Sequence, residues 1–141
     1  MRIMGIDYGD QHIGLALSDE SAFLCGRAWT LNEWDLDRAI VRIAEEARAN
    51  AVGLLVLGLP KNMDGTEGPR AEKSRVVAER LREATGLEVV LWDERRSSIE
   101  AHGILRANGK KEKKHRQTVD AVAASLILEG FLGAHGKDYR A

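Results

Sequence analysis

The chain has 141 residues, of which 44% are apolar and 30% charged, and its formal net charge is −1. This composition is that of a globular protein, and the length, with no internal linker, predicts a single domain over residues 1–141. No apolar run approaches the roughly 20 residues of a membrane helix, and no signal-peptide pattern precedes the first apolar segment. We therefore expect a cytoplasmic protein with no membrane partner.

The N-terminal third predicts an antiparallel meander. Short apolar segments are separated by turns that carry Gly9 and Asp19, which is the pattern of strands joined by tight connections. The predicted strands cover residues 2–7, 12–18 and 22–31.

The rest of the chain alternates helices with strands. Leu36, Ile40 and Ile43 recur at helical spacing after Asp35, a suitable N-cap, whereas "VGLLVLGLP" is apolar throughout, as in a strand covered on both faces. We predict helices over 35–50, 69–85, 97–108 and 118–132, and strands over 52–60 and 88–93. A meander followed by two crossover units gives an α/β fold, a five-stranded mixed sheet with helices on both faces.

Acidic residues fall where such a sheet collects ligands, outside the carboxyl ends of its parallel strands. Asp7 ends the first strand, Asp93 and Glu94 end the fifth, and Asp120 begins the final helix. Because side chains alternate along a strand, at most one of Asp93 and Glu94 shares a face with Asp7. For Asp120 the structural alternative is an acid that stabilises the first turn of its helix through the macrodipole.

Three converging carboxylates repel one another unless a cation lies between them. Oxygen ligands without a Cys or His cluster select Mg²⁺ or Mn²⁺ rather than zinc. Two such ions, about 4 Å apart, can activate a water on one side of a phosphodiester and stabilise the leaving oxygen on the other. The pattern therefore favours metal-dependent phosphodiester hydrolysis.

Four segments resemble, in order, the blocks of the YqgF/RuvX family: "DYGDQHIGLALSD", "GLPKNMDGTEG", "DERRSS" and "VDAVAASLIL". The family is RNase H-like, and its members are described as pre-16S rRNA 5′-end nucleases or Holliday junction resolvases. The resemblance implies that Asp7, Glu94 and Asp120 are the catalytic, metal-binding acids, which favours Glu94 over Asp93. His12 stands where the family usually has an arginine, and "DERRSS" departs from the usual "DERLTT"-like stretch.

Basic residues near these blocks are candidates for binding the substrate backbone, by phosphate contacts that read shape rather than sequence. The implied substrate is structured RNA, branched DNA or both, and a symmetric junction would favour a homodimer. The alternatives are a solvated charge run, a nucleic-acid-binding module that does not cut, and nucleotide hydrolysis. The candidate substrate-binding residues are Lys61, Arg70, Arg95, Arg96, Lys110, Lys111, Lys113, Lys114, His115 and Arg116.

Overall fold

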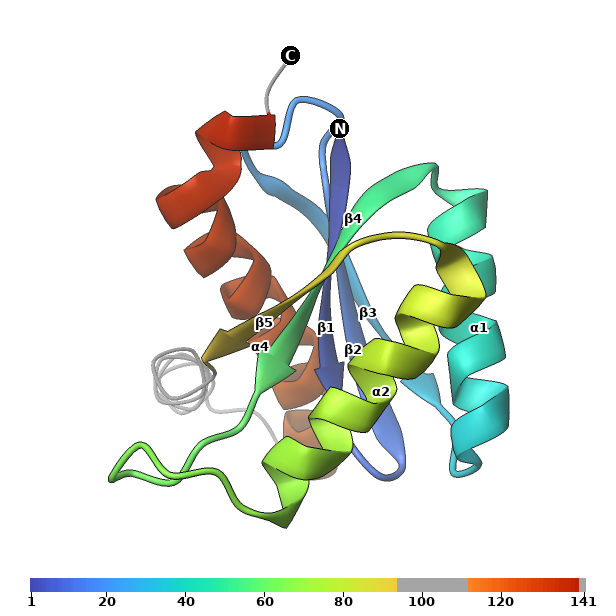
Figure 1. Ribbon diagram of the computed structural model, residues 1–141, viewed down its shortest axis with the longest axis vertical. Coiled ribbons are helices and arrows are strands. Elements are labelled where there is room, and N and C mark those ends of the chain that lie inside the picture. Colours follow the sequence, from blue (N-terminus) through green and yellow to red (C-terminus); the bar gives the residue numbers. More distant parts are fainter. Residues whose placement is uncertain (94–111, 140–141) are drawn as a thin grey trace.

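Five strands form one mixed sheet in the order β3-β2-β1-β4-β5 (Figure 1). The computed structural model describes residues 1–93 and 112–139, with the backbone alone for residues 112–120. Strand β1 is antiparallel to β2 and parallel to β4, β3 is antiparallel to β2, and β5 is parallel to β4. The predicted five-stranded mixed sheet is confirmed. The strands are β1 (Arg2–Tyr8), β2 (His12–Ser18), β3 (Cys25–Asn32), β4 (Val52–Leu59) and β5 (Val89–Asp93).

Helices cover both faces of the sheet, with α1 and α2 on one face and α4 on the other (Figure 1). Their bounds are α1 (Leu36–Ala49), α2 (Pro69–Thr85) and α4 (Glu112–His135), and a 3-10 turn, η1 (Gly136–Tyr139), follows α4. Asp35 caps α1 by accepting a hydrogen bond from the Arg38 N–H. The helix predicted over 97–108 lies outside the described residues. No helix in the described ranges is long and apolar enough to cross a membrane.

The start of α4 differs from the prediction. The chain is already helical at Glu112, ahead of the predicted start at Thr118, so the second half of the basic run belongs to the helix rather than to a connection. The segment "EKKHRQ" contains neither Gly nor Pro, and Glu, Lys, Arg and Gln are good helix formers. A capping signal at Thr118 did not outweigh these propensities.

Alternating side chains on β1 divide the interior into two layers. Met4 and Ile6 pack with α1 and α2, whereas Ile3 packs with α4. Gly5 lies on the α4 side, and a Cβ there would lie 2.8 Å from the Ala124 carbonyl oxygen and 2.9 Å from the Leu128 Cβ. Because only a hydrogen atom fits at position 5, α4 approaches β1 very closely at this point.

We expect Gly5→Ala to destabilise the protein by about 1–3 kcal/mol, because the added methyl group must displace helix backbone. Gly133→Ala, in α4, is the matched control, since a Cβ at Gly133 meets nothing within 4 Å. That control should be neutral or stabilise by up to about 1 kcal/mol. Urea unfolding of the two variants checks this, and equal behaviour of both would contradict the close approach.

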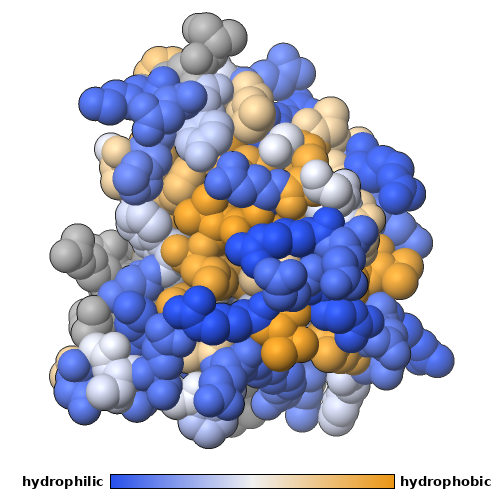
Figure 2. Space-filling model, viewed as in Figure 1, coloured by the Kyte–Doolittle hydropathy of each residue, from blue (hydrophilic) through white to orange (hydrophobic). Residues whose placement is uncertain are grey.

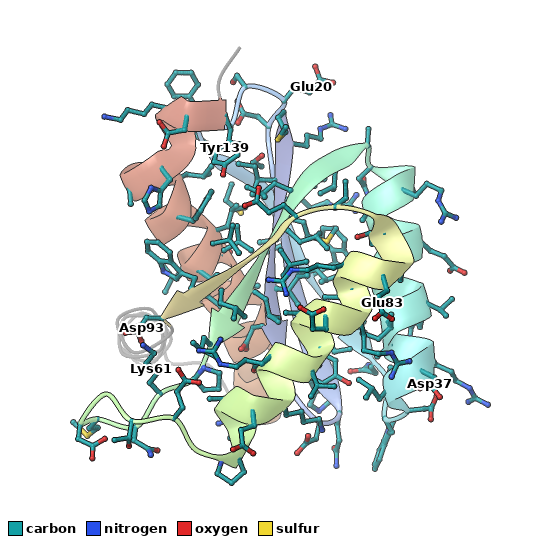
Figure 3. All side chains as sticks on the ribbon, in the orientation of Figure 1. Glu20, Asp37, Lys61, Glu83, Asp93 and Tyr139 are labelled. Atoms are coloured by element: carbon teal, nitrogen blue, oxygen red, sulfur yellow. The ribbon has the colours of Figure 1, made fainter. Side chains whose placement is uncertain are left out.

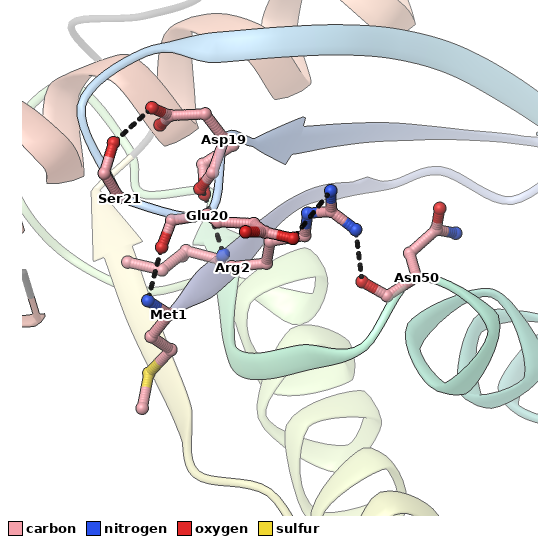
Figure 4. Close-up of polar contacts among 8 residues, drawn as sticks. Met1, Arg2, Asp19, Glu20, Ser21 and Asn50 are labelled. Atoms are coloured by element: carbon pink, nitrogen blue, oxygen red, sulfur yellow. Dashed lines mark hydrogen bonds and ion pairs between the residues drawn. The ribbon is translucent and has the colours of Figure 1, made fainter. Parts of the chain in front are cut away.

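The β2–β3 turn corrects the predicted third strand, which begins at Cys25 rather than at residue 22. The Asp19 carboxylate accepts hydrogen bonds from the backbone N–H groups of Phe23 and Leu24. It also accepts one from the Ser21 hydroxyl (Figure 4). Ala22 has a positive φ of 59°. These contacts hold residues 19–24 in a turn that apolar composition alone did not reveal. The hydroxyl and N–H donors hold the pKa of Asp19 at about 2, below its ordinary value of 3.8.

A lowered carboxyl pKa stabilises the folded state above the ordinary pKa, and this contribution disappears as the pH falls through the folded-state value. We therefore expect wild type to resist urea better than Asp19→Asn at pH 7, with the difference shrinking between about pH 4 and pH 2. Urea midpoints measured at pH 7 and pH 3 test this. A difference that stays constant with pH would contradict the assignment.

Candidate active site

Asp7 lies near the end of β1, on the sheet face that α4 covers. Its neighbours Ile6 and Tyr8 pack in the layer of α1 and α2, so the alternation of the strand turns Asp7 toward α4. The residue is half-buried. The carboxylate therefore shares the face on which Gly5 admits the helix.

Glycines flank Asp7 on both neighbouring strands. Asp7 pairs with Gly14 of β2, and the pairing of Ile6 with Leu57 brings Gly58 of β4 beside Asp7. Both glycines alternate with residues of the opposite layer, so they lie on the α4 face beside the carboxylate, and both are buried there. The half-buried Asp7 carboxylate is therefore flanked on both neighbouring strands by a residue without a side chain.

Asp93 lies on the other face. Trp92 packs edge-on against Phe131 of α4, with ring centroids 5.9 Å apart, and the alternation of β5 turns the next residue away from α4. Figure 3 shows Asp93 at the same end of the molecule as Lys61. Asp93 therefore does not share a face with Asp7, and Glu94 lies outside the described residues.

Asp120 belongs to α4, one helical turn before Ala124. Ala124 faces Gly5, and β1 and α4 run in opposite directions (Figure 1). Two residues along a strand advance about 6.6 Å and four along a helix about 6 Å, so we expect the backbone of residue 120 near the level of Asp7. The side chain of Asp120 lies outside the description.

The loop after β4 is ordered by its own polar groups. The Asn62 side chain donates to the Thr66 hydroxyl, and Asp64 accepts from the Thr66 N–H at 2.9 Å. Arg75 of α2 holds Glu67 through two hydrogen bonds of 2.7 Å. This loop carries Lys61, which is half-buried, and leads to Arg70, which is exposed in the first turn of α2.

The structure also brings together a charged cluster that the sequence did not indicate, on the α2 side of the same strand ends. Lys73 of α2 contacts the Asp10 carboxylate at 2.5 Å, and its ammonium lies 5.7 Å from the Tyr8 ring centroid. The hydrogen bond from Lys73 lowers the pKa of Asp10, and the same contact raises the pKa of Lys73. Burial raises the pKa of the Tyr8 phenol. The only signal for this cluster in the sequence was that Lys73 follows Arg70 by three residues, about one helical turn.

The other predicted residues are His12, four basic residues outside the described ranges and four residues of α4. His12 lies with its Nδ1 2.7 Å from the Asn32 Oδ1. Among the described side chains, no group of three His, Cys, Asp or Glu is placed to hold a metal ion. Arg95, Arg96, Lys110 and Lys111 lie outside the described residues, whereas Lys113, Lys114, His115 and Arg116 belong to α4, with side chains outside the description.

Solved structures define the class of this fold. Thermus thermophilus RuvC in complex with a Holliday junction substrate matches with a TM-score of 0.61 at 16% identity, over 94% of this chain and 96% of that chain. The fowlpox virus resolvase in complex with Holliday junction DNA matches with a TM-score of 0.59 at 12% identity, over 95% of this chain and 98% of that chain. The chain therefore has the RNase H-like fold of resolvases and nucleases.

The family follows from the sequence comparisons. The model of the RuvX family, described as Holliday junction resolvase, matches residues 1–134. Relatives named "Putative pre-16S rRNA nuclease" are 42% identical in Pelotomaculum thermopropionicum, over 99% of this chain and 92% of theirs, and in Bacillus thuringiensis, over 94% and 98%. The chain belongs to the RuvX family, and this membership implies a hydrolase acting on phosphodiester bonds.

Proposed function

We propose that this protein is a divalent-metal-dependent endonuclease that cuts structured nucleic acid. The relatives named as pre-16S rRNA nucleases and the family description as Holliday junction resolvase supply the two candidate substrates. The observation that carries the proposal is the position of Asp7, between two glycines, on the face that meets α4 one turn from Asp120.

Glu94 completes the proposed set of acids. Its assignment rests on the family resemblance, and it agrees with the packing of Trp92 against α4, which leaves Asp93 on the face opposite Asp7. Position 120 precedes the buried residues Ala123 and Ala124 by three and four residues, the spacing of one helix face. We assign Asp7, Glu94 and Asp120 to one site on this reasoning.

Carboxylate oxygens are the donors that Mg²⁺ and Mn²⁺ prefer, so this set of acids suits one or two such ions. A bound ion would supply an activated water and would stabilise the charge of the leaving oxygen. The acids would hold the ion, and Gly14 and Gly58 add no side chain beside Asp7.

The substrate backbone would be held by the predicted cations. Lys61 follows the end of β4, and Arg70 lies at the start of α2. Figure 2 shows mostly polar residues at this lower end of the molecule. Lys113, Lys114, His115 and Arg116 precede Asp120 in α4, and we propose that these residues and Arg95, Arg96, Lys110 and Lys111 also contact phosphates.

Asp7→Asn should abolish cleavage while the protein still folds and binds. Loss of groups that merely support metal ligands lowers activity by about 10–100-fold, so loss of a ligand should lower it by about 100-fold or more. The measurement is cleavage of a four-way DNA junction and of a precursor rRNA fragment with Mg²⁺ or Mn²⁺. If Asp7→Asn cuts as fast as wild type, the proposal is wrong. If wild type binds both substrates and cuts neither, the protein is the non-cleaving binding module.

A second comparison separates the two adjacent acids of β5. We expect Glu94→Gln to lose cleavage as Asp7→Asn does. Asp93→Asn should retain cleavage within about threefold, because Asp93 points to the face opposite Asp7. Thermal melting of both variants serves as the folding control. The reverse result, with Asp93→Asn inactive and stably folded, would exchange the two assignments.

A further inference from the structure

The structure assigns a second phosphate-binding site to the cavity that Tyr8, Asp10, Arg70 and Lys73 line. We infer that this cavity binds a backbone phosphate of the substrate, at a distance from the bond that is cut. In the free protein the Asp10 carboxylate pairs with Lys73, and the phosphate displaces that carboxylate when the substrate binds. This inference rests on the proposed nuclease function, and its ligand is a phosphodiester of DNA or RNA.

The cavity combines an open volume with two cationic side chains. Its volume is about 100 Å³, which is several times the space that one water molecule needs. Arg70 and Lys73 are three residues apart in α2, so the two cations lie on the same side of the helix. Arg70 is close enough to Asp10 to lower the pKa of its carboxyl, so both cations act on the same space.

Its location connects this cavity to the proposed catalytic acids. Tyr8 directly follows Asp7 in β1, and the two side chains point to opposite faces of the same strand end. Consecutive Cα atoms are about 3.8 Å apart, so a nucleic acid strand that crosses the end of β1 passes from one site to the other. Pro60, which follows β4, lines the cavity as well and brings it beside the loop of Lys61.

The ion pair in the cavity is one that a stronger anionic ligand can open. The side chains of Asp10 and Lys73 are 83% and 47% exposed, and ion pairs at such exposure stabilise a fold only weakly. A lysine ammonium has three donors and suits phosphate as a point charge. When Asp10 turns into solvent, the Tyr8 ring stays next to the ammonium and keeps it over the cavity.

A purely structural ion pair makes a different prediction from a phosphate site. If the pair only fastens the β1–β2 hairpin to α2, removal of either partner disturbs the same contact, and both variants change substrate binding in the same direction. If Asp10 competes with a phosphate for Lys73, the two variants change binding in opposite directions. The signs of the two effects therefore decide between these roles.

The experiment measures binding of a fluorescein-labelled four-way DNA junction and of a labelled RNA hairpin in the Asp7→Asn background, which prevents cleavage. We expect Asp10→Asn to bind about threefold tighter or more. Lys73→Gln should bind about threefold weaker or more, with a log affinity against log salt slope shallower by about 1. Lys73→Arg should restore the charge and most of the affinity. The two probes distinguish DNA from RNA as the source of the phosphate.

The pair formed by Asp37 and Arg80 is a matched control. Its contact is also 2.5 Å, its side chains are 77% and 38% exposed, and Arg80 lies seven residues after Lys73 in the same helix. That separation is about 10 Å, one Debye length at 0.1 M salt. Asp37→Asn should leave binding unchanged within twofold. The inference is overturned if Asp37→Asn tightens binding as much as Asp10→Asn, or if Asp10→Asn and Lys73→Gln both weaken it.

A titration of the isotopically labelled protein with inorganic phosphate separates this inference from the proposed function. Saturable shifts of the backbone amides of Lys73 and Ser74, lost in Lys73→Gln, are the expected result. They would support the cavity even if no nucleic acid were cut. If wild type shows no such shifts at matched ionic strength, the phosphate site is refuted, whatever the cleavage assays show.

Discussion

The close contact between β1 and α4 at Gly5 is the constraint on which the rest of the structure depends. The α4 side of the sheet carries small residues, Ala16 and Ala28, beneath the helix, and Ala124 faces Gly5 itself. The helix therefore lies closer to the strands than it could above larger side chains. This spacing sets how near a group on the first turns of α4 can come to Asp7. The packing of the core and the assembly of the proposed acidic site are consequences of one contact.

The end of β1 also separates two kinds of charge. Asp7 faces α4, and Tyr8, the next residue, faces α2, where Arg70 and Lys73 lie. A strand period of two thus places an acid and a cationic cavity back to back without a long connecting loop. In the proposed function, metal ions would bind the carboxylates and the substrate backbone would bind the cations. One strand end would then supply both kinds of charge while keeping them apart.

The sequence predicted the sheet and its order of elements because apolar periodicity is a local signal. It placed the start of the third strand too early, since the Asp19 turn depends on side-chain contacts to backbone groups, and it placed the start of α4 too late. Between Asp93 and Glu94 the residues alone left the choice open, and the family resemblance favoured Glu94. The packing of Trp92 against Phe131 turns Asp93 away from the face of Asp7, whereas Glu94 lies outside the described residues. The contact of Lys73 with Asp10 joins residues 63 positions apart, and no local pattern encodes such a contact.

The near-zero net charge of the chain is consistent with the proposed recognition of nucleic acid by its shape. A surface with many unpaired cations attracts any polyanion, and its affinity then carries little discrimination. Here Lys73 is paired with Asp10, Arg75 with Glu67 and Arg80 with Asp37 in the folded protein. In the proposed site, a phosphate binds Lys73 only when the rest of the nucleic acid strand is placed so that this phosphate displaces the Asp10 carboxylate. Asp10 therefore weakens the binding of wrongly shaped ligands, because its carboxylate already neutralises Lys73 when those ligands arrive.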